Sequence, residues 1–83
     1  MSLSPAECCR LAEALAMLSQ GRWSEFEDRL WLAFGDDWTR VRDMLARHRY
    51  ITMRGRWKDE PALTEPGAAF LERLRDRPIA AAG

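Results

Sequence analysis

The residues best suited to binding chemistry lie in one basic stretch of the chain. Residues 40–58 hold seven arginines or lysines against one acidic residue, Asp43, a formal charge of +6. Residues 1–39 hold three basic and seven acidic residues, and residues 59–83 hold three and five, so the whole chain is neutral. Phosphates of a nucleic acid are bound by clustered guanidinium and ammonium groups. The clustering therefore predicts a nucleic-acid surface that the net charge conceals.

A solvated surface is the alternative interpretation of the basic stretch. Exposed helix faces commonly carry arginine, and the whole chain uses 12 arginines to one lysine. Asp43 lies inside the stretch. Its carboxylate could accept a hydrogen bond from a cytosine amine, but an ion pair with Arg40 or Arg47 at helical spacing is the interpretation that we favour.

Trp57 is the aromatic residue with the clearest functional interest. It falls in a loop between two expected strands, with Arg56 and Lys58 as its neighbours. Its ring could stack on a nucleobase or sugar, or anchor a protein partner, because exposed aromatics beside arginine are common in interaction hot spots. Alternatively, the ring folds back over the hairpin or the third helix. Two interpretations also remain for Trp31, which could lie in the core or contact another subunit.

Catalytic chemistry has little support in the sequence. His48 is the only histidine, and its inward position near a helix end favours a capping or half-buried role. Cys8, Cys9 and His48 lack a fourth zinc ligand and a Cys-x-x-Cys spacing. The paired carboxylates at 36–37 and 59–60 have no neighbouring base, and no glycine-rich phosphate loop is present. We therefore expect no enzyme, metal, cofactor or small-molecule ligand.

Length and composition limit the architecture and the compartment. At 83 residues the chain has room for one domain, with order expected over residues 4–77 and a flexible tail over 78–83. The two cysteines are adjacent, which is a poor geometry for bridging a fold. The longest apolar runs have five residues, against about 20 for a membrane span, and no export signal is visible. We therefore expect a cytoplasmic protein with no membrane contact.

Helical periodicity predicts the elements that position the basic stretch. A first helix over residues 4–20 begins with a capping box at Ser4. A second helix over 24–34 begins with a similar box at Ser24, and its apolar residues predict burial on more than one side. A third helix follows two aspartates that compete as its cap. Its inward residues are Trp38, Val41, Leu45 and His48. Its opposite side carries Thr39, Arg40, Asp43, Ala46 and Arg47, with Arg42 on the flank.

The periodicity changes after the third helix. Residues 50–54 are rich in β-branched and aromatic types, which predicts a strand, and residues 55–61 favour a turn or loop. Residues 62–64 could pair back as a short second strand. Thr64 would then cap a last helix. The inward residues of that helix are Gly67, Phe70, Leu71 and Leu74.

Three helices, a hairpin and a closing helix resemble the winged helix-turn-helix family. The resemblance is carried by residues 41–45, by Tyr50-Ile51 and above all by Leu63-Thr-Glu-Pro-Gly67 followed by Phe70-Leu71. It implies a mainly α fold in which the hairpin is a wing. One departure is Arg49, where the family often has glycine. A residue in a left-handed conformation there would cost about 1 kcal/mol without glycine.

The resemblance implies a small DNA-binding protein, such as a transcriptional regulator. The third helix would meet the major groove or its phosphates, and the wing would hold the backbone or the minor groove. The residues concerned are Thr39, Arg40, Arg42, Arg47, Arg54, Arg56, Trp57 and Lys58. A homodimer or a protein partner is expected, with Trp31 and Trp57 as candidate contacts. The rival is a winged-helix adaptor, assembly factor or inhibitor that binds proteins and no DNA of its own.

Overall fold

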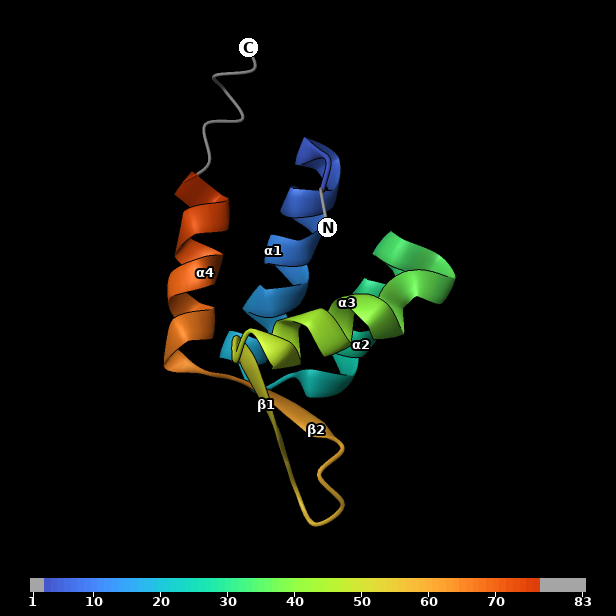
Figure 1. Ribbon diagram of the computed structural model, residues 1–83, viewed down its shortest axis with the longest axis vertical. Helices are drawn as coiled ribbons and strands as arrows, with labels where there is room; N and C mark the ends of the chain where they lie inside the picture. The colour runs from blue at the N-terminus through green and yellow to red at the C-terminus, as the bar shows by residue number, and fades with distance from the viewer. Residues whose placement is uncertain (1–2, 77–83) are drawn as a thin grey trace.

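Helices make up most of the structure, and the only strands in its described part form one hairpin. The computed structural model describes residues 3–76, so the tail expected over 78–83 lies outside the described residues. The elements in chain order are α1 (Pro5–Ser19), α2 (Trp23–Phe34), the 3-10 turn η1 (Gly35–Asp37), α3 (Trp38–Arg47), β1 (Ile51–Arg54), β2 (Glu60–Leu63) and α4 (Glu65–Asp76) (Figure 1). The expected order of elements is confirmed.

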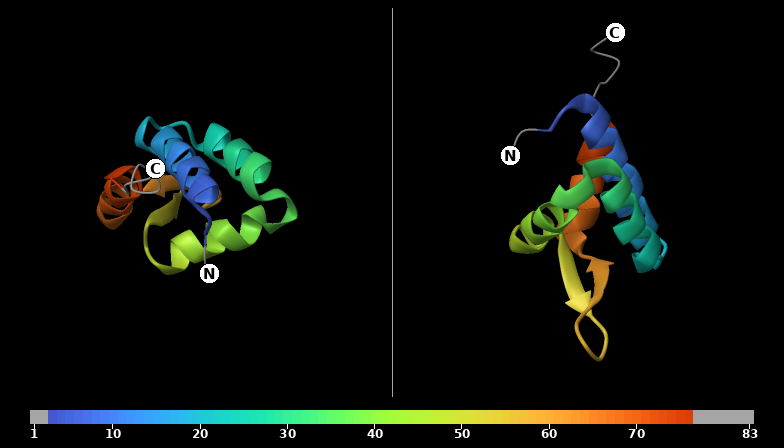
Figure 2. Two further views of the ribbon diagram at one scale, coloured as in Figure 1. Left: turned by 90° about the horizontal axis from the view of Figure 1, so that it is seen from above. Right: turned by 90° about the vertical axis from the view of Figure 1, so that its right-hand side faces the viewer.

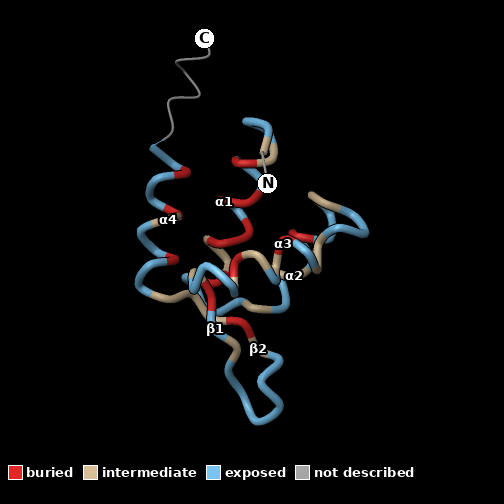
Figure 3. The backbone as a smooth tube through the Cα atoms, in the orientation of Figure 1, coloured by how far each residue is buried: buried red, intermediate tan, exposed pale blue. Residues whose placement is uncertain are grey.

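The core forms around α1, which lies between α2 and α4 (Figure 2). Leu11 and Leu15 are fully buried on α1, and Phe26 and Leu30 meet them from α2. Figure 3 shows the buried positions as an inward stripe along each helix. The core residues contributed by the rest of the chain are Val41, Leu45, Ile51, Leu71 and Leu74. Burial of these apolar side chains supplies the main favourable free energy of folding.

The helix starts were predicted with mixed success. At α1 the capping box is confirmed, because the Glu7 amide donates to Ser4 Oγ at 3.1 Å and the Ser4 amide to Glu7 Oε1 at 2.9 Å. The box at Ser24 is wrong. The Arg22 carbonyl already accepts from the Phe26 amide at 3.1 Å, so α2 begins at Trp23 and Ser24 lies inside its first turn.

Burial of α2 on more than one side is also wrong. Phe26 and Leu30 are buried, but Trp31 is 56% exposed and Leu32 is 72% exposed. The neighbouring helices α1 and α3 pack on the side of α2 that carries Phe26 and Leu30. Within residues 3–76, Trp31 and Leu32 therefore stay largely exposed, although their hydrophobicity suggested burial.

The hairpin pairs β1 with β2 in antiparallel register, from Ile51 opposite Leu63 to Arg54 opposite Glu60. The second strand begins two residues earlier than expected and includes Pro61, which pairs with Met53. A two-stranded sheet has only edge strands, where a missing amide donor is tolerated. Proline is therefore compatible with a position that the sequence suggested was loop.

Thr64 and Gly67 join the hairpin to α4. The Gly67 amide donates to Thr64 Oγ1 at 3.0 Å, which confirms Thr64 as the cap, and the Thr64 hydroxyl donates to the Arg49 carbonyl. A Cβ at Gly67 would overlap the Tyr50 carbonyl oxygen. Glycine at this position therefore lets α4 lie directly against the chain that leaves α3.

The chain leaves α3 through a left-handed residue that is not glycine. Arg49 has φ +64°, the Arg49 amide donates to the Ala46 carbonyl at 3.0 Å, and the Tyr50 amide donates to the Leu45 carbonyl at 2.9 Å. The end of α1 has the same pair of bonds, but there the left-handed residue is Gly21, with φ +76°. Both ends are Schellman turns, and only the turn at Arg49 is strained.

We expect Arg49→Gly to stabilise the fold by about 1 kcal/mol, because glycine adopts this conformation without a Cβ clash. The matched control is Gly21→Ala, which places a side chain in the equivalent turn where nothing lies within 4 Å and should destabilise by a similar amount. Chemical denaturation measures both. An unchanged or lower stability for Arg49→Gly would contradict the assignment of strain to this turn.

Candidate nucleic-acid interface

The exposed side of α3 carries Arg40, Asp43 and Arg47, as the periodicity predicted. Burial of Val41 and Leu45 fixes the rotation of the helix, since residues three and four apart share a face. Thr39 is half-buried rather than exposed. Of the five residues expected on the outward side, only Arg40, Asp43 and Arg47 are therefore exposed to a ligand.

Arg42 is held by the protein itself. Its guanidinium carbon lies 5.0 Å from the centre of the Trp38 ring, and its nitrogens lie 3.8 Å from Glu27 Oε2 and 3.8 Å from Asp43 Oδ1. Asp43 therefore pairs with its neighbour Arg42, and the prediction that it pairs with Arg40 or Arg47 is wrong. The structure thus separates Arg42 from the outward-facing arginines and gives it a packing role between α2 and α3.

Glu27 is the one carboxylate that this packing perturbs. Burial raises the pKa of Glu27 above its usual value, and the negative charges of Asp28 and Asp59 raise it further. The positive charge of Arg42 lowers the same pKa and so partly offsets the cost of burial. Arg42 therefore stabilises the ionised form of Glu27 at neutral pH.

The hairpin presents Trp57 and its basic neighbours to solvent. Trp57 is 78% exposed, so its ring does not fold back over the hairpin or α3. The Arg56 guanidinium carbon lies 5.7 Å from the centre of that ring. The turn is closed by the Lys58 amide, which donates to the Gly55 carbonyl at 3.1 Å. An exposed ring beside two cations is an arrangement suited to stacking and phosphate binding.

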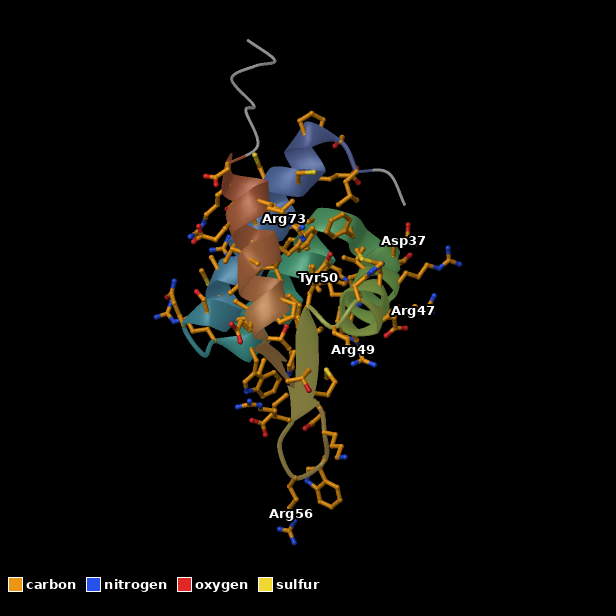
Figure 4. All side chains as sticks on the ribbon, turned by 60° about the vertical axis from the view of Figure 1, so that its left-hand side comes forward. Asp37, Arg47, Arg49, Tyr50, Arg56 and Arg73 are labelled. Carbon is orange, nitrogen blue, oxygen red and sulfur yellow. The ribbon has the colours of Figure 1, made fainter. Side chains whose placement is uncertain are left out.

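Six cations of α3, its exit and the hairpin are exposed, and within residues 3–76 the structure records no ion pair for any of them. This basic set consists of Arg40, Arg47, Arg49, Arg54, Arg56 and Lys58. Figure 4 shows Arg47 and Arg49 at the end of α3 and Arg56 at the hairpin tip, each reaching away from the helical core. These charges are therefore available to an anionic ligand.

Sequence reasoning missed a stack of aromatic rings beside the basic set. His48 was expected on the inward side but is exposed, because α3 ends at Arg47 and the left-handed turn redirects the chain. Its ring stacks on Tyr50, with centres 5.6 Å apart, and Tyr50 stacks on Phe70, with centres 4.2 Å apart. The contact that builds this stack, between the residue preceding β1 and α4, is not visible in local spacing.

The described part of the chain holds no metal-ligating cluster and no membrane-spanning helix. Among residues 3–76, no group of three or more histidine, cysteine, aspartate or glutamate side chains is placed to hold a metal ion. No helix within the same range is long and apolar enough to cross a membrane. Comparison with protein-family models, curated protein sequences and solved structures finds no match for the chain. The geometry of the site therefore carries the functional argument.

We expect Arg42→Ala to destabilise the fold by about 1–2 kcal/mol at neutral pH, because it removes the contact with Trp38 and leaves Glu27 without its counter-charge. Folding raises the pKa of Glu27, so protonation favours the folded state as the pH falls. The loss caused by Arg42→Ala should therefore shrink toward about pH 4.

Urea denaturation at the two pH values measures this difference. The control is Arg40→Ala, which removes an exposed arginine of the same helix and should change stability by less than about 0.5 kcal/mol. A loss for Arg42→Ala that is equally small would show that Arg42 is not a packing residue.

Proposed function

We propose that this protein is a winged-helix DNA-binding protein, a regulator of transcription, that contacts duplex DNA through α3 and the hairpin. The observation that carries the proposal is the basic set, six exposed cations without an ion pair in the described structure. A hairpin between the third and the last helix, with Trp57 exposed in its loop, adds support. Phosphate neutralisation by such a cluster supplies most of the sequence-independent affinity for DNA.

The charges around α3 favour a contact centred toward its C-terminal end. Asp36 and Asp37 are exposed just before the helix and would repel phosphates there. Arg47 and Arg49 lie at the other end, next to the hairpin. Arg40 then contributes from the first turn of α3, while Thr39 is half-buried and Arg42 supports the helix from behind. The DNA footprint runs from the end of α3 to the tip of the hairpin.

We expect the affinity for a generic duplex to fall steeply with salt, and Arg47→Ala and Arg56→Ala each to flatten the log–log salt dependence by about one unit. Each substitution removes one phosphate contact. Arg10→Ala removes an exposed arginine of α1 and should leave the slope unchanged. Fluorescence anisotropy across a salt series measures all four proteins.

If no duplex binding is detected at about 50 mM salt, the proposed DNA binding is wrong and a winged-helix adaptor becomes the better proposal. The observation that favours the adaptor is the pair of apolar side chains exposed on α2, Trp31 and Leu32. Clustered exposed aromatic and aliphatic side chains mark protein-binding surfaces. Under either function we propose that this side of α2 binds a protein, and a second copy of the chain is the simplest occupant.

We expect Trp31→Ser to convert a dimer into a monomer without loss of folded structure, because Trp31 is 56% exposed and contributes little to the core. Trp57→Ser removes the other tryptophan expected at a partner contact, and it should leave the dimer intact if the α2 side alone binds the second copy. Sedimentation equilibrium gives the mass of each protein. A native protein that is monomeric at all concentrations would show that the surface does not bind a second copy.

A further inference from the structure

The stacked rings beside the basic set form a column that runs from α4 to the end of α3. Tyr50 and Phe70 are nearly parallel, with 5° between their planes, and His48 and Tyr50 make an angle of 16°. Phe70 and Tyr50 are both half-buried against the core, and His48 is exposed. The column therefore has an anchored end at Phe70 and a solvent-facing end at His48.

Several contacts hold the column in place before any ligand arrives. The Arg73 guanidinium lies 5.7 Å from the Phe70 ring centre, and one of its nitrogens lies 3.5 Å from the Tyr50 hydroxyl. Two hydrogen bonds fix the backbone of Tyr50: its amide donates to the Leu45 carbonyl at 2.9 Å, and its carbonyl accepts from the Thr64 amide at 3.1 Å. A rigid platform loses little conformational entropy when a ring is added to it.

The charges next to the open end select the kind of ring. His48 stands between Arg47 and Arg49 in the chain, and both arginines belong to the basic set. In Figure 4, Tyr50 and Arg73 lie on the side of the molecule that also shows Arg49. An exposed aromatic ring whose two neighbours along the chain are arginines fits a planar group that carries phosphates, which is the chemistry of a nucleotide.

We propose that the exposed ring of His48 is the stacking site for an unpaired nucleobase next to a duplex, with Arg47 and Arg49 on the phosphates that flank that base. This inference rests on the proposed DNA binding and adds to it a substrate class, DNA with a single-stranded extension. Every base has a π face, so the site has no strong sequence preference. The packing of α4 would thereby be coupled to ligand contact, through Phe70 and Tyr50.

The experiment compares a blunt duplex, the same duplex with a short single-stranded overhang, and oligo-dT. One stacked base contributes about 1–3 kcal/mol, so the native protein should prefer the overhang to the blunt duplex by about fivefold or more. His48→Ala should abolish that preference. His48→Phe keeps a ring at the same place and should retain it, which a purely electrostatic role for histidine would not allow.

Two controls distinguish base stacking on His48 from a packing role of its ring and from stacking in the hairpin. Thermal unfolding of His48→Ala should match that of the native protein, because the side chain is exposed; a ring with only a packing role would instead change stability and leave the preference intact. Trp57→Ala should weaken all duplex binding but keep the overhang preference. If Trp57→Ala removes the preference and His48→Ala does not, the stacking site is in the hairpin and the proposal is wrong.

The blunt duplex distinguishes failure of this inference from failure of the proposed function. Equal affinity of the native protein for the blunt and overhanging duplexes overturns the inference and leaves duplex binding standing. Binding of the overhang or oligo-dT that depends on His48, without binding of the blunt duplex, upholds the stacking site and overturns duplex binding. Absence of binding to all three probes overturns both.

Discussion

The arrangement of the molecule depends on one close backbone approach, between the first turn of α4 and the chain that leaves α3. Thr64 accepts from the Gly67 amide and donates to the carbonyl of Arg49, and Gly67 has no Cβ to keep Tyr50 away. This junction fixes where β1 starts, where β2 ends and how α4 is oriented. The hairpin, the ring column and the end of α3 therefore hold their relative positions through a few polar contacts outside the apolar core.

The neutral net charge conceals two different roles of the arginines. Arg42 is paired and stacked between α2 and α3, where it compensates a partly buried carboxylate. The basic set has no such partner in the described structure and faces solvent. The sequence pattern alone treats all seven basic residues of the stretch as candidate ligand contacts. The structure shows that the Arg42 guanidinium, beside a tryptophan ring and a carboxylate, belongs to the packing instead.

Much of the fold follows from local signals, and much of the site does not. The capping box at Ser4, the inward stripes and the cap at Thr64 are encoded within a few residues of each other, so the sequence predicted them. The prediction of a cap at Ser24 was wrong, because the turn that ends α1 at Gly21 and Arg22 sets where α2 begins. The exposure of Trp31 and the column from His48 to Phe70 depend on what packs against them, because periodicity identifies apolar residues but not their covering partners.

Pro61 has a consequence for how molecules of this protein meet. The free edges of a two-stranded sheet can recruit a strand from another chain and begin aggregation. Here one strand contains a proline, which offers no N–H, and the other ends in Arg54 beside the charged turn. Such features oppose edge-to-edge pairing. The hairpin is thereby poorly suited to pairing with a strand of another chain, so its tip stays accessible.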